Sequence, residues 1–369
     1  MMKEFQWKTI LKLSGEGGSI TFLGKKNERE HWIYKRNINE IFSLEEMDDH
    51  PPNVEYQPSK TIKKLKPTVR KSNEATHWDS ARKMIEEYPL EYLKPVHVHP
   101  EFAEKVWDII STKKLPKHRL KLWVKACFPT TTNEIFELFY ALTKSKHTVV
   151  LTGAGMSVES GIPDFRSPSG WWKNIDPLTV ATVEALEENY DLFYEFYSVR
   201  INTLKGCEPH EGYRILAKWE RSDLIHEVAT QNVDGFHFKA LSNHVDELHG
   251  SILTYRCHQC ENEASRDQFL NKESCNFCNG KLRPNVVLFG EALLEKAWNN
   301  ALNHIQQADL VIVIGTSLQV YPVSQLPKMT NGKTVYINKE VSEFQSLFDV
   351  KIEGSARDTL IAVDQLIRS

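Results

Sequence analysis

The first stretch whose residues could take part in chemistry is a glycine-rich turn that follows an apolar run. Residues 149–151 are apolar, and Gly153 and Gly155 follow them. A strand that ends in Gly-x-Gly leaves backbone N–H groups that a pyrophosphate can approach. Val158 replaces the third glycine of the common dinucleotide fingerprint. Arg166, later in the loop, offers a guanidinium that binds phosphate bidentately. An ordinary turn after a buried strand is the alternative.

Two further polar clusters offer amide and imidazole chemistry. Gln231 and Asn232 follow the apolar run 225–229, and Asp234 comes two residues later. Side-chain amides suit a ribose hydroxyl or a carboxamide, and a carboxylate accepts from an amide N–H. An Asx-type turn is the alternative for this stretch. His249 stands beside a glycine, where an imidazole can take a proton from a substrate hydroxyl.

Four of the six cysteines form two Cys-x-x-Cys pairs, separated by fourteen residues. The pairs are Cys257 with Cys260 and Cys275 with Cys278. This spacing predicts a tetrahedral thiolate site for Zn²⁺. Four protein ligands close the coordination shell, so such an ion holds a module together and does not activate water. Reduced thiols or a disulfide are the alternatives, and no thioredoxin-like context supports a redox role.

An α/β sheet would bring the polar clusters together. Apolar runs at 148–151, 225–229, 310–314 and 334–337 each end in polar or small residues. A helical pattern at 135–142 leads into the first of them. Ligands of such sheets bind outside the carboxyl ends of the strands. We therefore predict a doubly wound, Rossmann-like parallel sheet with a ligand site at that edge.

The first part of the chain predicts a separate accessory module. Short strands are expected between residues 5 and 34, a proline- and lysine-rich connection at 46–75, and a helix at 102–110. Nothing in 1–128 forms a catalytic set. We predict an α+β module of unknown role over 1–128 and a catalytic domain over 129–369.

Length and composition limit the class of protein. A chain of 369 residues favours two domains. A formal net charge of −3 gives no support for a nucleic-acid-binding surface. No apolar run is long enough for a membrane span, and the N-terminus lacks the apolar segment of a signal peptide. We expect a cytoplasmic enzyme that binds neither nucleic acid nor membrane, with its oligomeric state unknown.

The order of the motifs resembles one known family. GAGMSVESGIPDFR, TQNVDG, ELHG, the two Cys-x-x-Cys pairs, RPNVVLFGE and GTSLQVYPVSQLP follow one another. Over roughly residues 132–369 the chain is similar to the sirtuins, which are NAD-dependent protein lysine deacylases. The resemblance implies an NAD domain, a small zinc-ribbon domain inserted at about 251–284, and an active site between them. It also implies NAD as a consumed co-substrate, one structural Zn²⁺ and acylated protein lysines as partners.

The resemblance also implies roles for individual residues. His249 is the general base, and Asn232 and Asp234 complete the catalytic set. The implied NAD-binding residues are Gly153, Ala154, Gly155, Ser157, Ile162, Asp164, Phe165, Arg166, Trp172, Gln231, Asn232, Asp234, Gly315, Thr316, Ser317 and Asn338. The implied substrate-binding residues are Tyr197, Arg200, Val287, Phe289 and Gly290. The four paired cysteines are the metal ligands.

The implied reaction transfers an acyl group from lysine to ADP-ribose, and nicotinamide leaves. Tyr197 and Arg200 resemble the Tyr-x-x-Arg pair of sirtuins that remove succinyl or malonyl groups. At i, i+3 on a helix they share one face, where an acidic acyl group could bind. The alternative is that Tyr197 packs and Arg200 is solvated. Leu241 replaces a family glycine, so the geometry of the turn after it stays open.

Other functions remain compatible with the same residues. An NAD hydrolase or ADP-ribosyl transferase, regulated by residues 1–128, would use the same cofactor site. The run 283–291 is expected to expose an edge that can pair with an extended peptide, because Pro284 and Gly290 would keep it from pairing further within the protein. A hydrolase or transferase would give the zinc module and this run less reason to exist. A non-enzymatic NAD-binding scaffold is the third interpretation, and the intact set of motifs argues against it.

Overall fold

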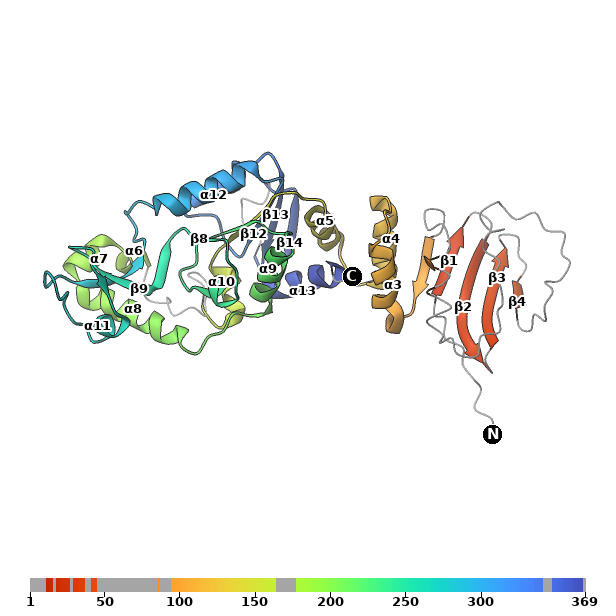
Figure 1. Cartoon of the computed structure of the whole chain (residues 1–369), viewed down its shortest axis with the longest axis horizontal. Helices are drawn as coiled ribbons and strands as arrows, with labels where there is room; N and C mark the ends of the chain where they lie inside the picture. The colour runs from red at the N-terminus through yellow and green to blue at the C-terminus, as the bar shows by residue number, and fades with distance from the viewer. Residues whose placement is uncertain are drawn as a thin grey trace, which may run out of the picture. The chain divides into compact units, whose positions relative to one another are not determined.

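The computed structural model describes residues 11–15, 18–26, 29–36, 41–44, 82, 85–86, 94–163, 177–340 and 347–367 (Figure 1). Backbone contacts divide the chain into two units. The first unit comprises Met1–Phe136 with Leu366–Ser369, and the second comprises Glu137–Gln365. Within the described residues, no helix is long and apolar enough to cross a membrane.

The first unit contains an antiparallel sheet of five strands in the order β4-β3-β2-β1-β5. The strands are β1 (Leu11–Gly15), β2 (Gly18–Lys26), β3 (Arg29–Arg36), β4 (Ile41–Leu44) and β5 (Lys94–Val98). Three of them confirm the short strands expected near the N-terminus. Because successive strands β1 to β4 are sequence neighbours, this part of the sheet is a simple meander.

Two helices continue the first unit after β5. A 3₁₀ turn, η1 (Pro100–Phe102), leads into α3 (Ala103–Ser111), and α4 (Lys117–Cys127) follows. The indole rings of Trp107 and Trp123 are fully buried. Trp107 also packs edge-on against Phe128, with ring centroids 6.1 Å apart. Both an antiparallel sheet and helices are therefore present, which confirms an α+β accessory unit.

The second unit is built on a parallel sheet of six strands in the order β14-β13-β12-β6-β7-β8. The strands are β6 (Thr148–Thr152), β7 (Glu227–Thr230), β8 (Val245–Glu247), β12 (Leu310–Ile314), β13 (Lys333–Asn338) and β14 (Val350–Glu353). The four central strands are those predicted from the sequence. The edge strands β8 and β14 were missed, because they are short and not continuously apolar.

Helices cover both faces of this sheet (Figure 1). Ala301 and Ile305 of α12 (Glu295–Gln307) pack on alternate side chains of β6 and β12. The opposite face carries α9 (Glu211–Arg221) and α13 (Ala356–Ile367), where Lys218 and Trp219 of α9 bond to Asp364 of α13. The helix α5 (Asn133–Leu142) leads into β6. The predicted doubly wound α/β fold is confirmed.

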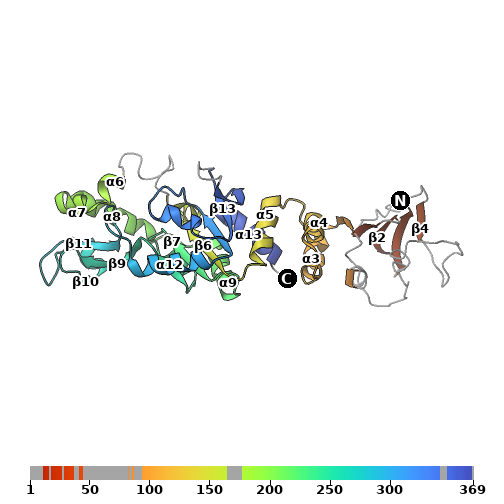
Figure 2. The ribbon, with the colours of Figure 1, turned by 90° about the horizontal axis from the view of Figure 1, so that it is seen from above.

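A second, smaller core lies beyond β8, formed by two separate segments (Figure 2). The later segment holds the three-stranded sheet β10-β9-β11. Its elements are β9 (Gly250–Cys257), β10 (Glu263–Ala264), α11 (Arg266–Leu270) and β11 (Leu282–Val286). The earlier segment supplies α6 (Pro177–Val180), α7 (Val183–Glu188) and α8 (Tyr190–Leu204). We call these two segments together the small lobe.

Four short elements complete the second unit. They are η2 (Ala154–Met156), η3 (Val158–Ser160), α10 (Phe236–Lys239) and η4 (Val323–Lys328). Leu241 is the second residue after α10, and it adopts a left-handed conformation with φ of 71°. Its N–H donates to the carbonyl of Phe238, and its side chain is 71% exposed. The left-handed backbone at Leu241 is strained, and this strain is not offset by burial of the leucine side chain.

We predict that Leu241→Gly stabilises the protein. Glycine removes a left-handed penalty of about 1–2 kcal/mol, and it loses roughly 0.5–1 kcal/mol through the entropy of the unfolded chain. The free energy of unfolding, measured with urea, should rise by roughly 0.5–1 kcal/mol. Leu241→Ala is the control, because it keeps the strain and removes the side chain, and should give no gain. A loss of stability in Leu241→Gly would contradict this account.

Candidate functional site

Backbone hydrogen bonds join the ends of four parallel strands to the residues that follow three of them. The N–H of Gly153, after β6, donates to Ile314 O at 3.0 Å, and that of Gly155 donates to Gly315 O at 2.7 Å. The N–H of Gly315, after β12, donates to Ile337 O of β13 at 2.9 Å. Gln231 N, after β7, donates to Thr152 O at 2.9 Å. The predicted convergence at the carboxyl edge is therefore present.

The glycines permit a backbone approach that side chains would block. A Cβ on Gly155 would lie 2.8 Å from Gly315 Cα, and one on Gly153 would lie 2.6 Å from Thr316 Cβ. In this structure the N–H of Gly153 donates to Ile314 O, and the N–H of Gly155 donates to Gly315 O. The glycines are needed here for loop packing.

Polar side chains extend this edge toward β13. Gln231 Nε2 donates to Thr316 Oγ1 at 3.0 Å. Tyr336 OH donates to the carbonyl of Thr316 at 2.8 Å, and Asn338 Nδ2 donates to Tyr336 OH at 2.8 Å. Ser317 is half-buried and follows Thr316 directly. These residues thus form one hydrogen-bonded strip along the ends of β7, β12 and β13.

Ser157 lies at the centre of a buried network with Asn232 and Asp234. Its Oγ is 2.6 Å from Asp234 Oδ2 and 3.0 Å from Asn232 Nδ2. Asn232 Nδ2 also donates to the carbonyl of Gly153 at 3.0 Å. Tyr213 OH, from α9, is 2.7 Å from Ser157 Oγ and is fully buried. Sequence reasoning missed Tyr213, because no motif surrounds it.

The carboxylates at this edge have shifted pKa values. Burial raises the pKa of Asp234, while hydrogen bonds from Ser157 and the Phe236 N–H, and the charge of Arg200, act in the opposite direction. Burial and the neighbouring Asp234 raise the pKa of Glu247 to about 7. A dry, negatively charged site of this kind is a candidate for function.

His249 follows the short edge strand β8, so it also lies at the carboxyl edge of the sheet. Its Nδ1 is 3.0 Å from the carbonyl of Gln231. A carbonyl only accepts, so Nδ1 carries the proton and Nε2 offers a lone pair. Burial lowers the pKa of His249, and the bond to Gln231 opposes this in part. Gly250 has a φ of 73°, and a Cβ there would lie 2.0 Å from Asn285 O.

The 283–291 run was expected to expose an edge, with Pro284 preventing further pairing inside the protein. Pro284 pairs with Tyr255 in the β9–β11 ladder, and β11 lies at the edge of its three-stranded sheet. Beyond β11, Val287 N donates to His249 O and Phe289 N donates to Ala181 O, both at 2.9 Å. Phe289 and Gly290 are exposed. The run therefore joins the small lobe to the His249 loop.

A buried ion pair shapes the end of this run. Arg283 is fully buried, and its guanidinium contacts both carboxylate oxygens of Glu291 at 2.6 and 2.8 Å. The same guanidinium donates to Val286 O at 2.6 Å, and Glu291 accepts from Leu288 N at 2.8 Å. Bidentate geometry of this kind holds the turn from 286 to 291 in one conformation.

Tyr197 and Arg200 both lie on α8 in the small lobe. Tyr197 is 3% exposed and packs against Phe193 and Phe196, with ring centroids 4.7 and 4.9 Å away. Arg200 is half-buried, and its Cζ lies 5.5 Å from the centre of the Phe196 ring. Arg200 interacts electrostatically with Tyr197 and Asp234. It thus links α8 to the network around Ser157.

Four NAD-binding predictions, for Asp164, Phe165, Arg166 and Trp172, lie outside the described residues. Ile162 lies near the end of the described part of the same loop and is half-buried. Its N–H donates to Ser157 O at 3.3 Å. Ala154, also half-buried, begins η2 and accepts from Ser157 N.

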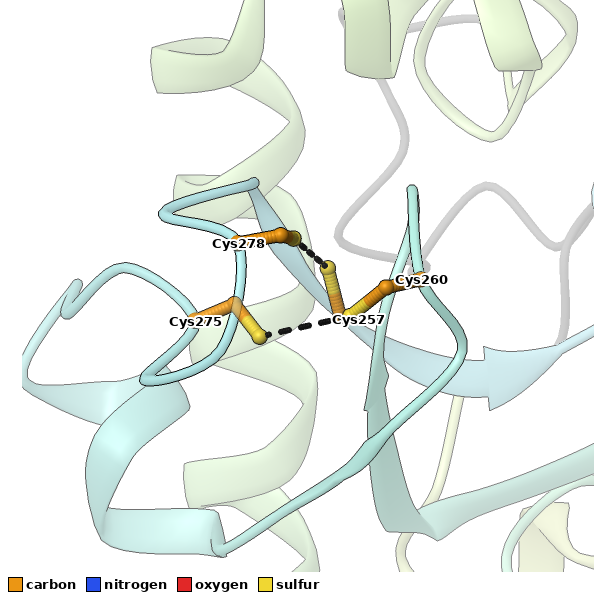
Figure 3. A group of neighbouring side chains, drawn as sticks. All are labelled: Cys257, Cys260, Cys275 and Cys278. Atoms are coloured by element: carbon orange, nitrogen blue, oxygen red, sulfur yellow. Dashed lines mark hydrogen bonds between the residues drawn. The ribbon is translucent and has the colours of Figure 1, made fainter.

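The four paired cysteines converge in the small lobe (Figure 3). All four sulfur atoms lie within 4.8 Å of one another. Cys257 and Cys278 are 3.4 Å apart, and Cys260 and Cys275 are 3.6 Å apart, so neither contact is a disulfide. A tetrahedron with metal–sulfur bonds of about 2.3 Å has edges of roughly 3.8 Å. The donor set and its spacing fit a structural zinc ion.

Known proteins resemble the second unit in sequence. The family model described as "Sir2 family" matches residues 153–322. NAD-dependent protein deacetylase 1 of Geobacillus kaustophilus is 50% identical over 215 residues, covering 57% of this chain and 89% of the relative. NAD-dependent protein deacylase 2 of Pyrobaculum aerophilum is 39% identical over 224 residues, covering 59% of this chain and 90% of the relative.

Solved structures resemble it in fold as well. A Sir2 complex with a p53 peptide and NAD⁺ has a TM-score of 0.57 and 35% identity, covering 62% of this chain and 95% of the other. A structure described as the structural basis for the mechanism and regulation of Sir2 enzymes has a TM-score of 0.60 and 35% identity, with coverage of 64% and 99%. The sirtuin resemblance is confirmed, and the chain belongs to the Sir2 family.

Proposed function

We propose that this protein is an NAD-dependent protein lysine deacylase. The observation that carries the proposal is the placement of His249, whose Nε2 lone pair is set by the bond of Nδ1 to Gln231. His249 lies at the carboxyl edge of the sheet, as does the network of Ser157, Asn232 and Asp234. The printed names of the relatives, NAD-dependent deacetylases and deacylases, support the same activity.

The residues at the edge fit NAD. NAD supplies the ribose that receives the acyl group, and nicotinamide is its leaving group. Gly153, Ala154 and Gly155, with Gly315, Thr316 and Ser317, would lie along its phosphates and adenine ribose, and Asn338 on its adenosine side. Ile162, Asp164, Phe165, Arg166 and Trp172 would complete this binding surface. The contact between the two glycine loops supports the assignment, because it brings six of these residues together.

The chain's own groups would then carry out three tasks. Asn232 and Asp234 can bond an amide, and we assign them the nicotinamide carboxamide. Gln231 holds the His249 ring through its carbonyl, while its side chain faces Thr316 and is assigned the nicotinamide ribose. The acyl oxygen would bond to C1′ of the ribose as the bond to nicotinamide breaks. His249 Nε2 would then take a proton from a ribose hydroxyl, whose oxygen attacks the acyl carbon, and addition of water would complete the release of free lysine and O-acyl-ADP-ribose.

The acylated lysine would approach along the 287–290 run. An extended peptide can add to backbone groups there, and Val287, Phe289 and Gly290 are assigned this contact. Val287 N is bonded to His249 O, so a peptide on this run lies beside the base. The Arg283–Glu291 pair keeps the run in place, because its buried charges satisfy each other.

From the positions of Tyr197 and Arg200, we propose that this protein's preferred substrates carry a negatively charged acyl group. Arg200 is a half-buried guanidinium near Asp234, on the same helix as Tyr197. A succinyl or malonyl carboxylate could pair with it bidentately. Tyr197 packs closely against two phenylalanines, so its ring would form one side of the acyl-binding site.

The zinc ion is assigned a structural role. Four cysteine ligands leave no open coordination position for water. The cluster ties β9 to the loop before β11, and Cys257 and Cys275 belong to the small-lobe core. The ion therefore supports the lobe that carries α8 and the 287–290 run.

We further propose that residues 129–369 form the catalytic domain and that 1–128 form an accessory module. The four cysteines can bind a metal ion only while they stay reduced. This requirement for a reducing compartment supports a cytoplasmic location. Acylated protein lysines are the assigned partners, and neither nucleic acid nor membrane is assigned.

The reaction is tested by mass spectrometry of acetyl-lysine and succinyl-lysine peptides incubated with NAD. We expect O-acyl-ADP-ribose, nicotinamide and free lysine, and His249→Ala should abolish all three. Because burial lowers the pKa of His249, the base stays neutral below the ordinary histidine pKa of 6.5. The fall of kcat/KM that reports protonation of His249 should therefore have its midpoint below pH 6.5.

The exposed His244 provides the control, since His244→Ala should keep the profile. If no acyl substrate gave O-acyl-ADP-ribose, the deacylase proposal would be wrong. NAD loss without any acyl substrate, abolished in His249→Ala, would instead indicate an NAD hydrolase or an ADP-ribosyl transferase.

Acyl preference is tested with Arg200→Ala. Loss of a charge-assisted hydrogen bond of about 1.5–3 kcal/mol corresponds to roughly a 10- to 100-fold change in kcat/KM. The ratio of succinyl-lysine to acetyl-lysine turnover should fall by that factor. Arg214→Ala, an exposed arginine on α9, should leave the ratio unchanged. An equal fall for both substrates would refute selectivity through Arg200.

Removal of zinc should unfold the small lobe. Cys257→Ser, or treatment with a chelator, removes a ligand or the ion that closes the four-thiol site. We expect loss of bound zinc by elemental analysis, a lower melting temperature, and protease cleavage within residues 250–286. Cys207→Ser is the matched control, because this half-buried thiol lies outside the cluster. A Cys257→Ser variant with full melting temperature would exclude a structural zinc.

A further inference from the structure

Tyr213 has no place in the reaction described so far, yet its hydroxyl reaches the centre of the site. The residue lies in the first part of α9, and its side chain is fully buried. Its ring packs against His237 and Phe236, with centroids 4.8 and 5.6 Å away. Its OH lies 2.7 Å from Ser157 Oγ. The ring is therefore held by packing, and the hydroxyl has one fixed direction.

The direction of each proton in this network follows from the chemistry of the groups. A serine hydroxyl has one proton and two lone pairs. Asn232 Nδ2 is a donor, so it fills one lone pair of Ser157 Oγ. An ionised Asp234 only accepts, so Ser157 gives its single proton to Asp234 Oδ2, at 2.6 Å. Tyr213 must then donate into the second lone pair.

Protonation of Asp234 at Oδ2 would break this pattern, while protonation at Oδ1 would place the proton on the oxygen that accepts from Phe236 N at 3.0 Å. If Asp234 donated to Ser157, both lone pairs of Ser157 Oγ would be filled, and Ser157 would have to donate to Tyr213. Among the described residues, Ser157 Oγ is the acceptor that the structure offers to Tyr213 OH, since the Asn232 Nδ2 at 3.5 Å is itself a donor. The phenol proton would then be buried without a partner, which is unfavourable.

We propose that Tyr213 is a positioning residue that keeps Asp234 ionised, by donating to Ser157 and so aligning the Ser157 proton toward the carboxylate. The inference rests on the proposed role of Asp234 at the nicotinamide site. Tyr213 acts through Ser157 and touches no reacting atom. It opposes the burial that otherwise favours the neutral carboxylic acid.

Other charged groups face Asp234 and set the background against which Tyr213 acts. Arg200, from α8, favours the ionised form, and Glu247, from β8, disfavours it when it is itself charged. Burial raises the pKa of Tyr213 well above its usual range, with a further contribution from Asp234, so the phenol stays protonated and remains a donor. The Tyr213 hydroxyl therefore remains a donor throughout the neutral pH range.

The test is the titration of Asp234 in Tyr213→Phe, which keeps the packed ring and removes only the hydroxyl. Protein labelled with ¹³C at the aspartate carboxyl carbon is followed by NMR across pH, and Asp234→Asn identifies the Asp234 resonance. We expect its midpoint to move upward by about one pH unit in Tyr213→Phe, equivalent to about 1.4 kcal/mol.

Tyr190→Phe is the matched control. Its hydroxyl donates to Leu282 O at 2.8 Å in the small lobe, so this variant loses a comparable hydrogen bond elsewhere. It should lower stability without moving the Asp234 midpoint. An unchanged midpoint in Tyr213→Phe would overturn the inference. The NMR titration does not depend on turnover, so it tests this inference even if the deacylase proposal fails.

Discussion

The close contact between two glycine loops is the constraint on which the rest of the site depends. The turn after β6 meets the turn after β12 with their backbones in contact, so a Cβ on Gly155 would lie 2.8 Å from Gly315 Cα. Only residues without side chains permit this approach. Because the two turns are joined, Ser157 and Thr316 are brought next to the Gln231–Asp234 loop after β7. The polar side chains meet for that reason.

Directional hydrogen bonds then decide what these side chains can do. The carbonyl of Gln231 selects the tautomer of His249, so its lone pair is at Nε2. Asn232 bonds both Gly153 O and Ser157, which fixes the loop that carries Asp234. The 287–290 run, which follows the small lobe in the chain, is held beside this loop because Val287 N donates to His249 O. His249, Asp234 and the 287–290 run therefore share one backbone framework.

Much of this arrangement was predictable, because the signals lay in short contiguous stretches. Continuous apolar runs gave the four central strands, and the cysteine spacing gave the metal cluster. The edge strand β8 was missed because three half-buried residues carry no periodic signal, although it positions His249. Tyr213 was missed because its contact with Ser157 joins residues 56 positions apart. The backbone partners of Gly153 and Gly155 were likewise beyond sequence, since only the fold reveals them.

The most direct test of the central claim is a crystal structure of the protein with NAD and an acyl-lysine peptide. The account predicts that His249 Nε2 lies within hydrogen-bond distance of a ribose hydroxyl, about 2.6–3.2 Å, while Nδ1 remains on the Gln231 carbonyl. It also predicts the peptide backbone along residues 287–290. A ribose bound away from His249, or an imidazole turned from Gln231, would contradict it.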